Sequence, residues 1–239
     1  MRVTSEDAAA LVRGVATNNQ SQRRRGGSEW RTGPAAAKVL RDCAAFSDIT
    51  MTVPRQRVQL RTQDGDVTIR NVGEARVEAM SGNVSLRDIN GAVEVTTVSG
   101  DVELANCRGA IHLRTISGDI NGQELRPSDQ NGDLEARSVS GDINLEKVAH
   151  RQLEIVTVSG DAEIDALLPR GSRYSLKSTT GDITLTMPPS ASFQLTAKAT
   201  RGEIINDFGV KQAKQGVGDS GDAALNIYSY SGTIHLRRK

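Results

Sequence analysis

The most constraining feature of this sequence is a short unit that recurs nine times. A glycine, followed in most copies by aspartate, stands at positions 65, 82, 100, 118, 141, 160, 181, 202 and 232. The successive spacings are 17, 18, 18, 23, 19, 21, 21 and 30 residues. Repeats of this length are typical of solenoids and arrays, so they have to be interpreted before any local structure is assigned.

Apolar residues recur at five fixed positions around each glycine. Counted from the glycine, these positions are −7, −5, −2, +2 and +4, and forty of the forty-five are apolar. The exceptions are Gln63, Gly122, Thr179, Thr200 and Asn206. The residues between them are mostly polar, so each copy predicts two short strands with one buried face. A glycine joins them because the turn needs a backbone angle that a Cβ would oppose.

Position −2 is assigned to the core by this alignment. Met80, Val98 and Ile116 are then expected to form one buried ladder, and Val98→Asp is expected to abolish folding. The polar positions predict two outward columns. One contains Arg61, Glu78, Thr96, Arg114, Arg137 and Lys177, and the other contains Thr68, Ser85, Glu103, Asn121, Asn144 and Glu163.

Two all-β architectures fit this pattern. Each copy is either one coil of a parallel β-solenoid or a hairpin of an antiparallel meander that closes into a barrel or sandwich. The near-constant spacing favours the solenoid, because stacked coils require equivalent positions to stay in register and a meander does not. Nine coils at about 4.8 Å would form a rod about 43 Å long. Longer spacings place insertions at residues 123–131 and 211–221.

Composition excludes several classes of function. The chain has 239 residues and a formal net charge of +1, which argues against a specific nucleic-acid-binding protein. Aromatic residues make up only 3% of it, so stacking platforms and aromatic sugar-binding clefts are not expected. No cluster has metal-ligand spacing, and no phosphate-binding loop motif occurs. We therefore expect no enzymatic activity, no catalytic, cofactor-binding or metal-binding residues, and no cofactor.

Two local patterns resemble functional sites but are better explained otherwise. Gly218-Asp219-Ser220-Gly221 imitates a serine-protease nucleophile, yet nothing around His112, His150 or His235 completes a triad. The aspartates that follow the repeat glycines could bind Ca²⁺ between coils. One carboxylate per coil is too few for that cation, so we expect these side chains to cap turns.

The N-terminal segment differs from the repeats. Residues 1–45 are assigned to a short helix and a basic flexible linker, and residues 46–239 to the solenoid. Thr4 and Asp7 fit a helix start, and apolar spacing predicts a helix over residues 5–16. Residues 18–33 are polar, with the run Arg23-Arg24-Arg25 and with Trp30, and are interpreted as a linker. Contact with a membrane is expected only through this basic segment.

The two cysteines and the lack of a recognisable targeting signal in the sequence as given bear on disulfide pairing and on location in the cell. Cys43 and Cys107 are too few for a disulfide framework, and two free thiols are favoured over one bridge. Cys107 aligns with Val72 and Ile89, so it is predicted to be a small buried residue. The sequence as given contains no signal peptide or membrane span, which predicts a cytoplasmic location unless the true start lies upstream.

Several repeat strings resemble a known family. VSGDVEL, VSGDINL, VSGDAEI and TTGDITLTMPPSASFQLTAKATRGEI are similar to the bacterial DUF4097 β-strand-repeat proteins, also described as adhesin-like. The resemblance covers residues 48–238. It implies a parallel β-solenoid, often in envelope-associated or stress-linked proteins, with no established enzymatic activity and no catalytic residues to transfer.

The leading hypothesis is therefore a non-enzymatic structural or interaction protein, a scaffold or adhesin-like module that binds protein or itself through its faces or ends. The alternative is a β-helix that binds or processes polysaccharide, which would require a groove lined by Trp30, Tyr174, Tyr228 and Tyr230. The helix of residues 5–16 is expected to cap the first coil. Leu225–Lys239 is expected to be the last coil, blunted by its three terminal cations, which predicts a monomer or weak dimer.

Overall fold

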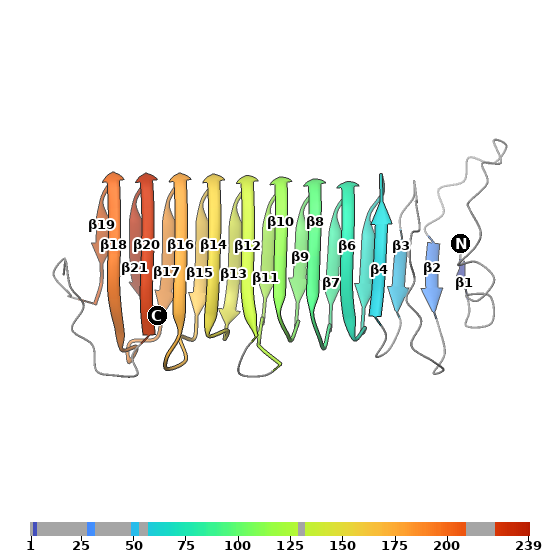
Figure 1. The fold of residues 1–239 in the computed structure, drawn as a ribbon, viewed down its shortest axis with the longest axis horizontal. Helices are drawn as coiled ribbons and strands as arrows, with labels where there is room; N and C mark the ends of the chain where they lie inside the picture. The colour runs from blue at the N-terminus through green and yellow to red at the C-terminus, as the bar shows by residue number, and fades with distance from the viewer. Residues whose placement is uncertain (1, 4–27, 32–48, 53–56, 129–131, 209–222) are drawn as a thin grey trace.

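All of the regular structure in the described part of the chain is β-sheet. The computed structural model describes residues 2–3, 28–31, 49–52, 57–128, 132–208 and 223–239. In these ranges the strands form two sheets, and every pairing between named strands is parallel. The sheets face each other along a rod whose strands run across its long axis (Figure 1). This arrangement confirms the parallel β-solenoid and excludes the antiparallel meander.

The nine-stranded sheet contains the long strands that precede the repeat glycines. In hydrogen-bonding order they are β18 (Phe193–Arg201), β20 (Ala223–Ser231), β16 (Arg173–Thr180), β14 (Gln152–Ser159), β12 (Asp133–Ser140), β10 (Ile111–Ser117), β8 (Val93–Ser99), β6 (Glu74–Ser81) and β4 (Arg57–Thr62).

The twelve-stranded sheet contains the short strands that follow the glycines, together with three strands before the first copy. In order they are β1 (Arg2–Val3), β2 (Ser28–Arg31), β3 (Ile49–Thr52), β5 (Val67–Arg70), β7 (Val84–Arg87), β9 (Val102–Ala105), β11 (Ile120–Gln123), β13 (Ile143–Val148), β15 (Ala162–Ala166), β17 (Ile183–Met187), β21 (Ile234–Arg238) and β19 (Ile204–Asn206).

Equivalent positions of successive copies lie opposite one another. Ile111 of β10 pairs with Val93 of β8 on one side and with Leu134 of β12 on the other. The insertion between the fourth and fifth copies does not disturb this register, because Ile120 pairs with Ile143. The resulting apolar ladders fill the space between the two sheets and form one continuous core.

The repeat glycine is required for two separate reasons. Gly141 has a φ of +139°, which L side chains rarely adopt, and a Cβ placed there would lie 2.2 Å from the carbonyl oxygen of Gly118. The backbone-angle reason is the one predicted from the sequence. The second reason follows from stacking, since each turn packs directly on the turn of the preceding coil. At Gly202 the stacking reason acts alone: its φ is not positive, but a Cβ would lie 2.1 Å from the Gly232 oxygen.

The order of the coils changes at the C-terminal end. The seven copies from Gly65 to Gly181 stack in chain order, but β20 and β21 then lie inside β18 and β19. The prediction that Leu225–Lys239 forms the outermost coil, blunted by its terminal cations, is therefore wrong. Burial gives the physical reason. Ile227 of β20 and Leu236 of β21 are fully buried in the inner place, whereas their register equivalents Ala197 and Asn206, which have less apolar surface to lose, stay half-buried at the end.

Position −2 points outward, which corrects the predicted core. Met80, Val98 and Ile116 are exposed, and the residue before each of them, such as Thr115, is buried instead. The strands stay regular up to the turn, so side chains alternate strictly and positions −7, −5 and −3 face inward. Position −3 is Thr, Ser or Ala in every copy, so its polar composition hid it from the apolar pattern.

The N-terminal segment contributes strands to the same sheet. Ser28 of β2 pairs with Ile49 of β3, so the four residues Ser28–Arg31 of the expected linker belong to the solenoid. The helix predicted over residues 5–16 and Cys43 lie outside the described residues, and the boundary at residues 45/46 stays a prediction. No helix that could span a membrane occurs in the described part of the chain.

Candidate interaction surface

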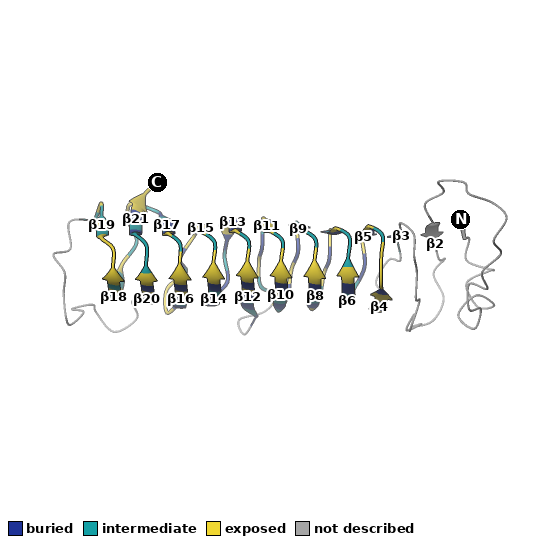
Figure 2. Ribbon diagram, turned by 90° about the horizontal axis from the view of Figure 1, so that it is seen from above, coloured by how far each residue is buried: buried dark blue, intermediate teal, exposed yellow. Residues whose placement is uncertain are grey.

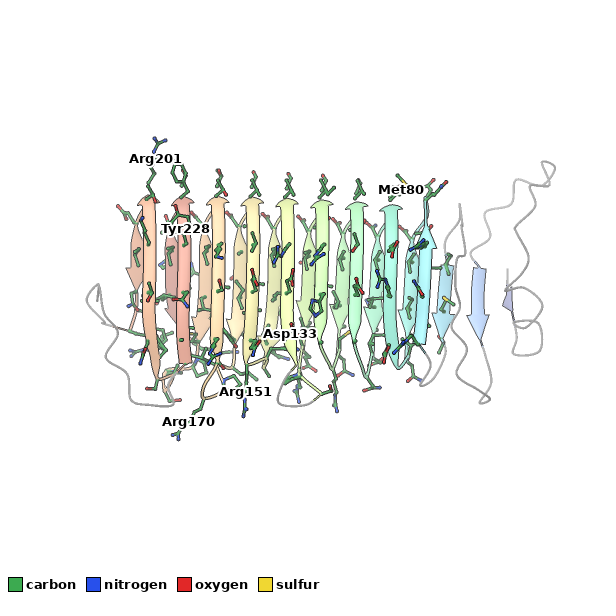
Figure 3. The ribbon with its side chains drawn as sticks, viewed as in Figure 1. Met80, Asp133, Arg151, Arg170, Arg201 and Tyr228 are labelled. Carbon is green, nitrogen blue, oxygen red and sulfur yellow. The ribbon has the colours of Figure 1, made fainter. Side chains whose placement is uncertain are left out.

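An apolar ridge runs along the edge where the strands of the nine-stranded sheet end. We use this name for the −2 residues of five successive copies, Met80, Val98, Ile116, Val139 and Val158. Their exposed fractions lie between 42% and 58%. Figure 2 shows the exposed strand tips of this sheet side by side, and Figure 3 places Met80 at this edge. At a coil spacing of about 4.8 Å the ridge is about 19 Å long.

The ridge ends toward the C-terminal end of the rod. The next −2 residue is Thr179, and the one after it is Tyr230, which is 40% exposed. The guanidinium of Arg201 lies 5.4 Å from the centre of the Tyr230 ring. Figure 3 shows Arg201 at the same edge of the sheet as Met80 but at the opposite end. The cation thus lies against the aromatic ring, and the unbroken line of exposed aliphatic −2 side chains is confined to the coils from Gly82 to Gly160.

An acidic column lies beside the ridge, three residues further along each coil. We use this name for Asp101, Asp119, Asp142, Asp161 and Asp182. Each aspartate Oδ1 from Asp101 to Asp161 accepts a hydrogen bond from the backbone N–H of the next aspartate, at 2.8–2.9 Å. Asp182 accepts one from Thr233 in the same way, at 2.6 Å. The carboxylates therefore cap turns, as predicted, but each caps the turn of the neighbouring coil.

The opposite flank of the ridge is the charged face, the outer surface of the nine-stranded sheet. Its side chains pair between coils: Arg61 Nε lies 2.9 Å from Glu78 Oε2, and Arg76 Nη1 lies 3.0 Å from Glu94 Oε2. The predicted column of Arg61, Glu78, Thr96, Arg114, Arg137 and Lys177 lies on this face in one register, with Val156 between Arg137 and Lys177. The second predicted column, from Thr68 to Glu163, lies on the outer surface of the twelve-stranded sheet.

The centre of the charged face is organised around Glu135. Arg114 Nη2 and Arg137 Nε lie 3.3 Å and 2.5 Å from its Oε1, and His112 Nδ1 lies 3.5 Å from its Oε2. Partial burial raises the pKa of Glu135, but the Arg114 hydrogen bond and the nearby charges outweigh this and lower it. A shallow depression beside this cluster is lined by Glu94, Val95, Thr96, His112 and Arg114. It is open and lined mainly by charged and polar side chains, whereas a small-molecule site is typically an enclosed and mostly apolar pocket.

Three buried titratable residues belong to the core. Burial raises the pKa of the Cys107 thiol to about 11, so this residue acts as the small apolar side chain that was predicted. The ring nitrogen Nε2 of His150 lies 2.9 Å from the carbonyl oxygen of Gly109, and burial lowers the pKa of His150. The hydroxyl of Tyr174 donates to the carbonyl oxygen of His150 at 3.0 Å, and burial raises the pKa of Tyr174. These groups brace the core and are closed to solvent.

The residues that could have indicated other chemistry are not brought together. Gly218-Asp219-Ser220-Gly221 lies outside the described residues. Tyr174 is buried, and Trp30 in β2 lies toward the other end of the rod from Tyr228 and Tyr230 in β20. The groove that would have supported a polysaccharide-binding β-helix is therefore not formed by these four residues. Within the described ranges no three His, Cys, Asp or Glu side chains are arranged to hold a metal ion.

A parallel β-solenoid whose outer features are an apolar ridge and paired charges defines a scaffold or interaction type of protein. Comparison of the sequence with protein families gives two overlapping matches to one family, Toastrack DUF4097, over residues 44–172 and 137–237. The chain belongs to the Toastrack DUF4097 family, as its repeat strings indicated. No curated protein and no solved structure matches the chain.

The ridge is the functional feature that the sequence pattern did not reveal. A signal for it was nevertheless present in the spacing. Positions −7 and −5 are two residues apart, whereas −5 and −2 are three apart, which a regular strand cannot place on one face. A strict two-residue period would have assigned position −3 to the core and position −2 to the surface.

Proposed function

We propose that this protein is a non-enzymatic scaffold that binds another protein along the apolar ridge and the charged columns beside it. The observation that carries the proposal is the ridge, because five aliphatic side chains stand exposed in one line on five successive coils. A contiguous exposed apolar strip costs solubility and typically marks an interaction site. Family membership supports the proposal: Toastrack domains are generally thought to mediate protein interactions and are not known as enzymes.

The shape and charge of this surface favour a protein partner. A line about 19 Å long matches an elongated macromolecular contact better than a small molecule, which needs an enclosing pocket. The flanking charges are of both signs, with Asp119 and Asp142 on one side of the ridge and Arg114 and Arg137 on the other. A nucleic-acid site would require one continuous basic strip to contact phosphates.

Site-specific photo-crosslinking in native cells tests the proposal. Ile116 is replaced by a photoreactive amino acid, and a matched variant carries the same group at Asn121, which is exposed on the outer surface of the twelve-stranded sheet. We expect a protein adduct from position 116 and none from position 121. The absence of any protein adduct at Ile116, or equal adducts at both positions, would refute the proposal.

A cytoplasmic location, an adhesin-like role and membrane contact through the basic N-terminal segment all stay predictions. Most of that segment, including the run Arg23-Arg24-Arg25, lies outside the described ranges. Cell fractionation with an antibody against the solenoid tests the location, and recovery in the membrane fraction would contradict it.

A further inference from the structure

We infer that the partner along the apolar ridge is a second copy of this chain, docked in parallel with the two-fold axis along the rod. The inference rests on the proposed function, because it names the occupant of the same ridge. It is carried by a second observation, the difference in charge between the two flanks of the ridge.

One flank of the ridge is acidic on four of its five coils, and Asn83 stands at the equivalent position beside Met80. The acidic column contributes one carboxylate per coil from Asp101 to Asp182. Each of these side chains is exposed, and none forms an ion pair with another described residue. Their hydrogen bonds to backbone N–H groups use Oδ1, and no cation among the described residues lies within ion-pair distance of them.

The other flank is mainly cationic in the same coils. In the five coils of the acidic column, the charged-face column nearest the ridge consists of Thr96, Arg114, Arg137, Val156 and Lys177, so its charged side chains are all cations. Lys177 forms no ion pair with a described residue. Arg114 and Arg137 share the partly buried Glu135, but their own side chains are 60% and 47% exposed, so both guanidinium groups are also accessible to a partner.

This difference selects one of the two symmetric ways of joining ridge to ridge. A two-fold axis perpendicular to the rod would make the copies antiparallel and place acidic flank against acidic flank. A two-fold axis along the rod makes them parallel and places each acidic flank against the partner's cationic flank, on both sides of the ridge. Only the parallel dimer is electrostatically complementary. It also places every coil opposite the same coil of the partner, so Ile116 faces Ile116.

The size of the contact predicts a weak dimer. The ridge and the acidic column together span six coils, from the coil of Gly82 to the coil of Gly181. At about 4.8 Å per coil their length is about 29 Å, and a strip about 20 Å wide then buries about 600 Å² from each copy. Stable interfaces bury about 800 Å² from each partner, so this contact falls at their lower limit. Its flanking ion pairs are exposed to solvent, so salt should weaken it.

Disulfide trapping tests the arrangement in the full chain. Single cysteines are placed at Val98, Ile116 and Val158 in a Cys43→Ser background, with Asn121→Cys on the opposite surface as the matched control. Cys107 is buried and can stay. In the parallel dimer all three ridge cysteines face their own copy and cross-link under mild oxidation, while the control stays monomeric. Sedimentation at tens of micromolar should show a dimer that dissociates when salt is raised.

Each outcome distinguishes this inference from the proposed function. Cross-linking at only one ridge position, or between Val98→Cys and Val158→Cys chains in a mixture, would establish an antiparallel dimer and overturn the inference. A monomer with no ridge cross-link would also overturn it. In that case a photo-adduct of Ile116 with a different protein would still uphold the proposed function. An Ile116 adduct at twice the monomer mass supports both.

Discussion

Leu113 and Ile116 lie three residues apart in the same strand and occupy opposite environments. Leu113 belongs to position −5 and is fully buried, whereas Ile116 belongs to position −2 and is 52% exposed. Both are aliphatic, and both recur at their positions in most copies. The recurrence of an apolar residue therefore identifies a stacked position, but only its parity along the strand shows whether that position faces the core or the surface.

The largest effect is expected on the core side of this comparison. Leu113→Asp places a carboxylate between Val95 and Ala136, its register partners in the buried ladder. No cation lies in that ladder, so desolvation of the charge is uncompensated, and we expect a loss of several kcal/mol or failure to fold. Circular dichroism and thermal melting measure this. A melting temperature close to that of the unmodified protein would show that position −5 is not a core position.

The next largest loss of stability is expected from substitution of the repeat glycines, whose turns connect the two strands of each coil. In Gly141→Ala the new Cβ would lie 2.2 Å from the Gly118 oxygen, and the φ of +139° is strained as well. Gly171 is a control with a positive φ of +72° but no atom within 4 Å of an added Cβ. We expect Gly141→Ala to cost a few kcal/mol and Gly171→Ala about 1 kcal/mol.

Urea unfolding of these two variants separates backbone strain from stacking. Equal losses of unfolding free energy would mean that the close approach of successive turns contributes nothing beyond the unfavourable φ. Gly202→Ala adds a third point, because only the close approach applies at that position.

Much of the fold could be predicted from these same local rules. The positions of the turns, the inward residues at −7, −5, +2 and +4, the buried Cys107 and both outward columns follow from side-chain alternation and stacking. Position −3 could not be recognised from composition. Thr115 and Ser138 are buried there, and their hydroxyls make no hydrogen bond to another described residue. Nothing in the polar character of such residues indicates burial.

The C-terminal exchange and the charge asymmetry of the ridge depend on long-range contacts. The coil of Gly232 and the coil of Gly202 share the same pattern, so either could pair with β16. Only Ile227 and Leu236, which stand where the other coil has Ala197 and Asn206, favour one order. The acidic and cationic columns likewise can be recognised as the two flanks of one surface only when position −2 is known to lie between them and to be exposed.

A smaller effect on the free energy of unfolding is expected from a change of pH, through His150, which like Leu113 is buried in the core. Burial lowers its pKa below the value of 6.5 that applies in the unfolded chain. Between these two values the unfolded chain binds a proton that the folded chain excludes. The stabilisation from neutral His150 is therefore complete above about pH 6.5 and decreases as the pH falls toward the folded-state pKa.

Unfolding free energies measured from pH 7.5 to pH 5 test this sign. The curve of the unmodified protein should fall with decreasing pH, and that of His150→Leu should be flatter over the same interval, although its absolute stability is lower because the contact with Gly109 is lost. Identical slopes would show that His150 does not contribute to the pH dependence.

The smallest effect on stability is expected at the ridge, where Ile116→Asp is the counterpart of Leu113→Asp. The new carboxylate is solvated in the monomer, because the side chain it replaces is already about half exposed, so we expect the free energy of unfolding to change by less than about 1 kcal/mol. The same reasoning applies to Val98→Asp, which the sequence alone predicted to abolish folding.

Ile116→Asp should have a large effect on association. In the parallel dimer two carboxylates would face each other across the two-fold axis with no cation between them, so the dimer should be lost in sedimentation at tens of micromolar. A loss of several kcal/mol in the monomer would place position −2 in the core after all. Full stability together with unchanged association would instead remove the ridge from the interface.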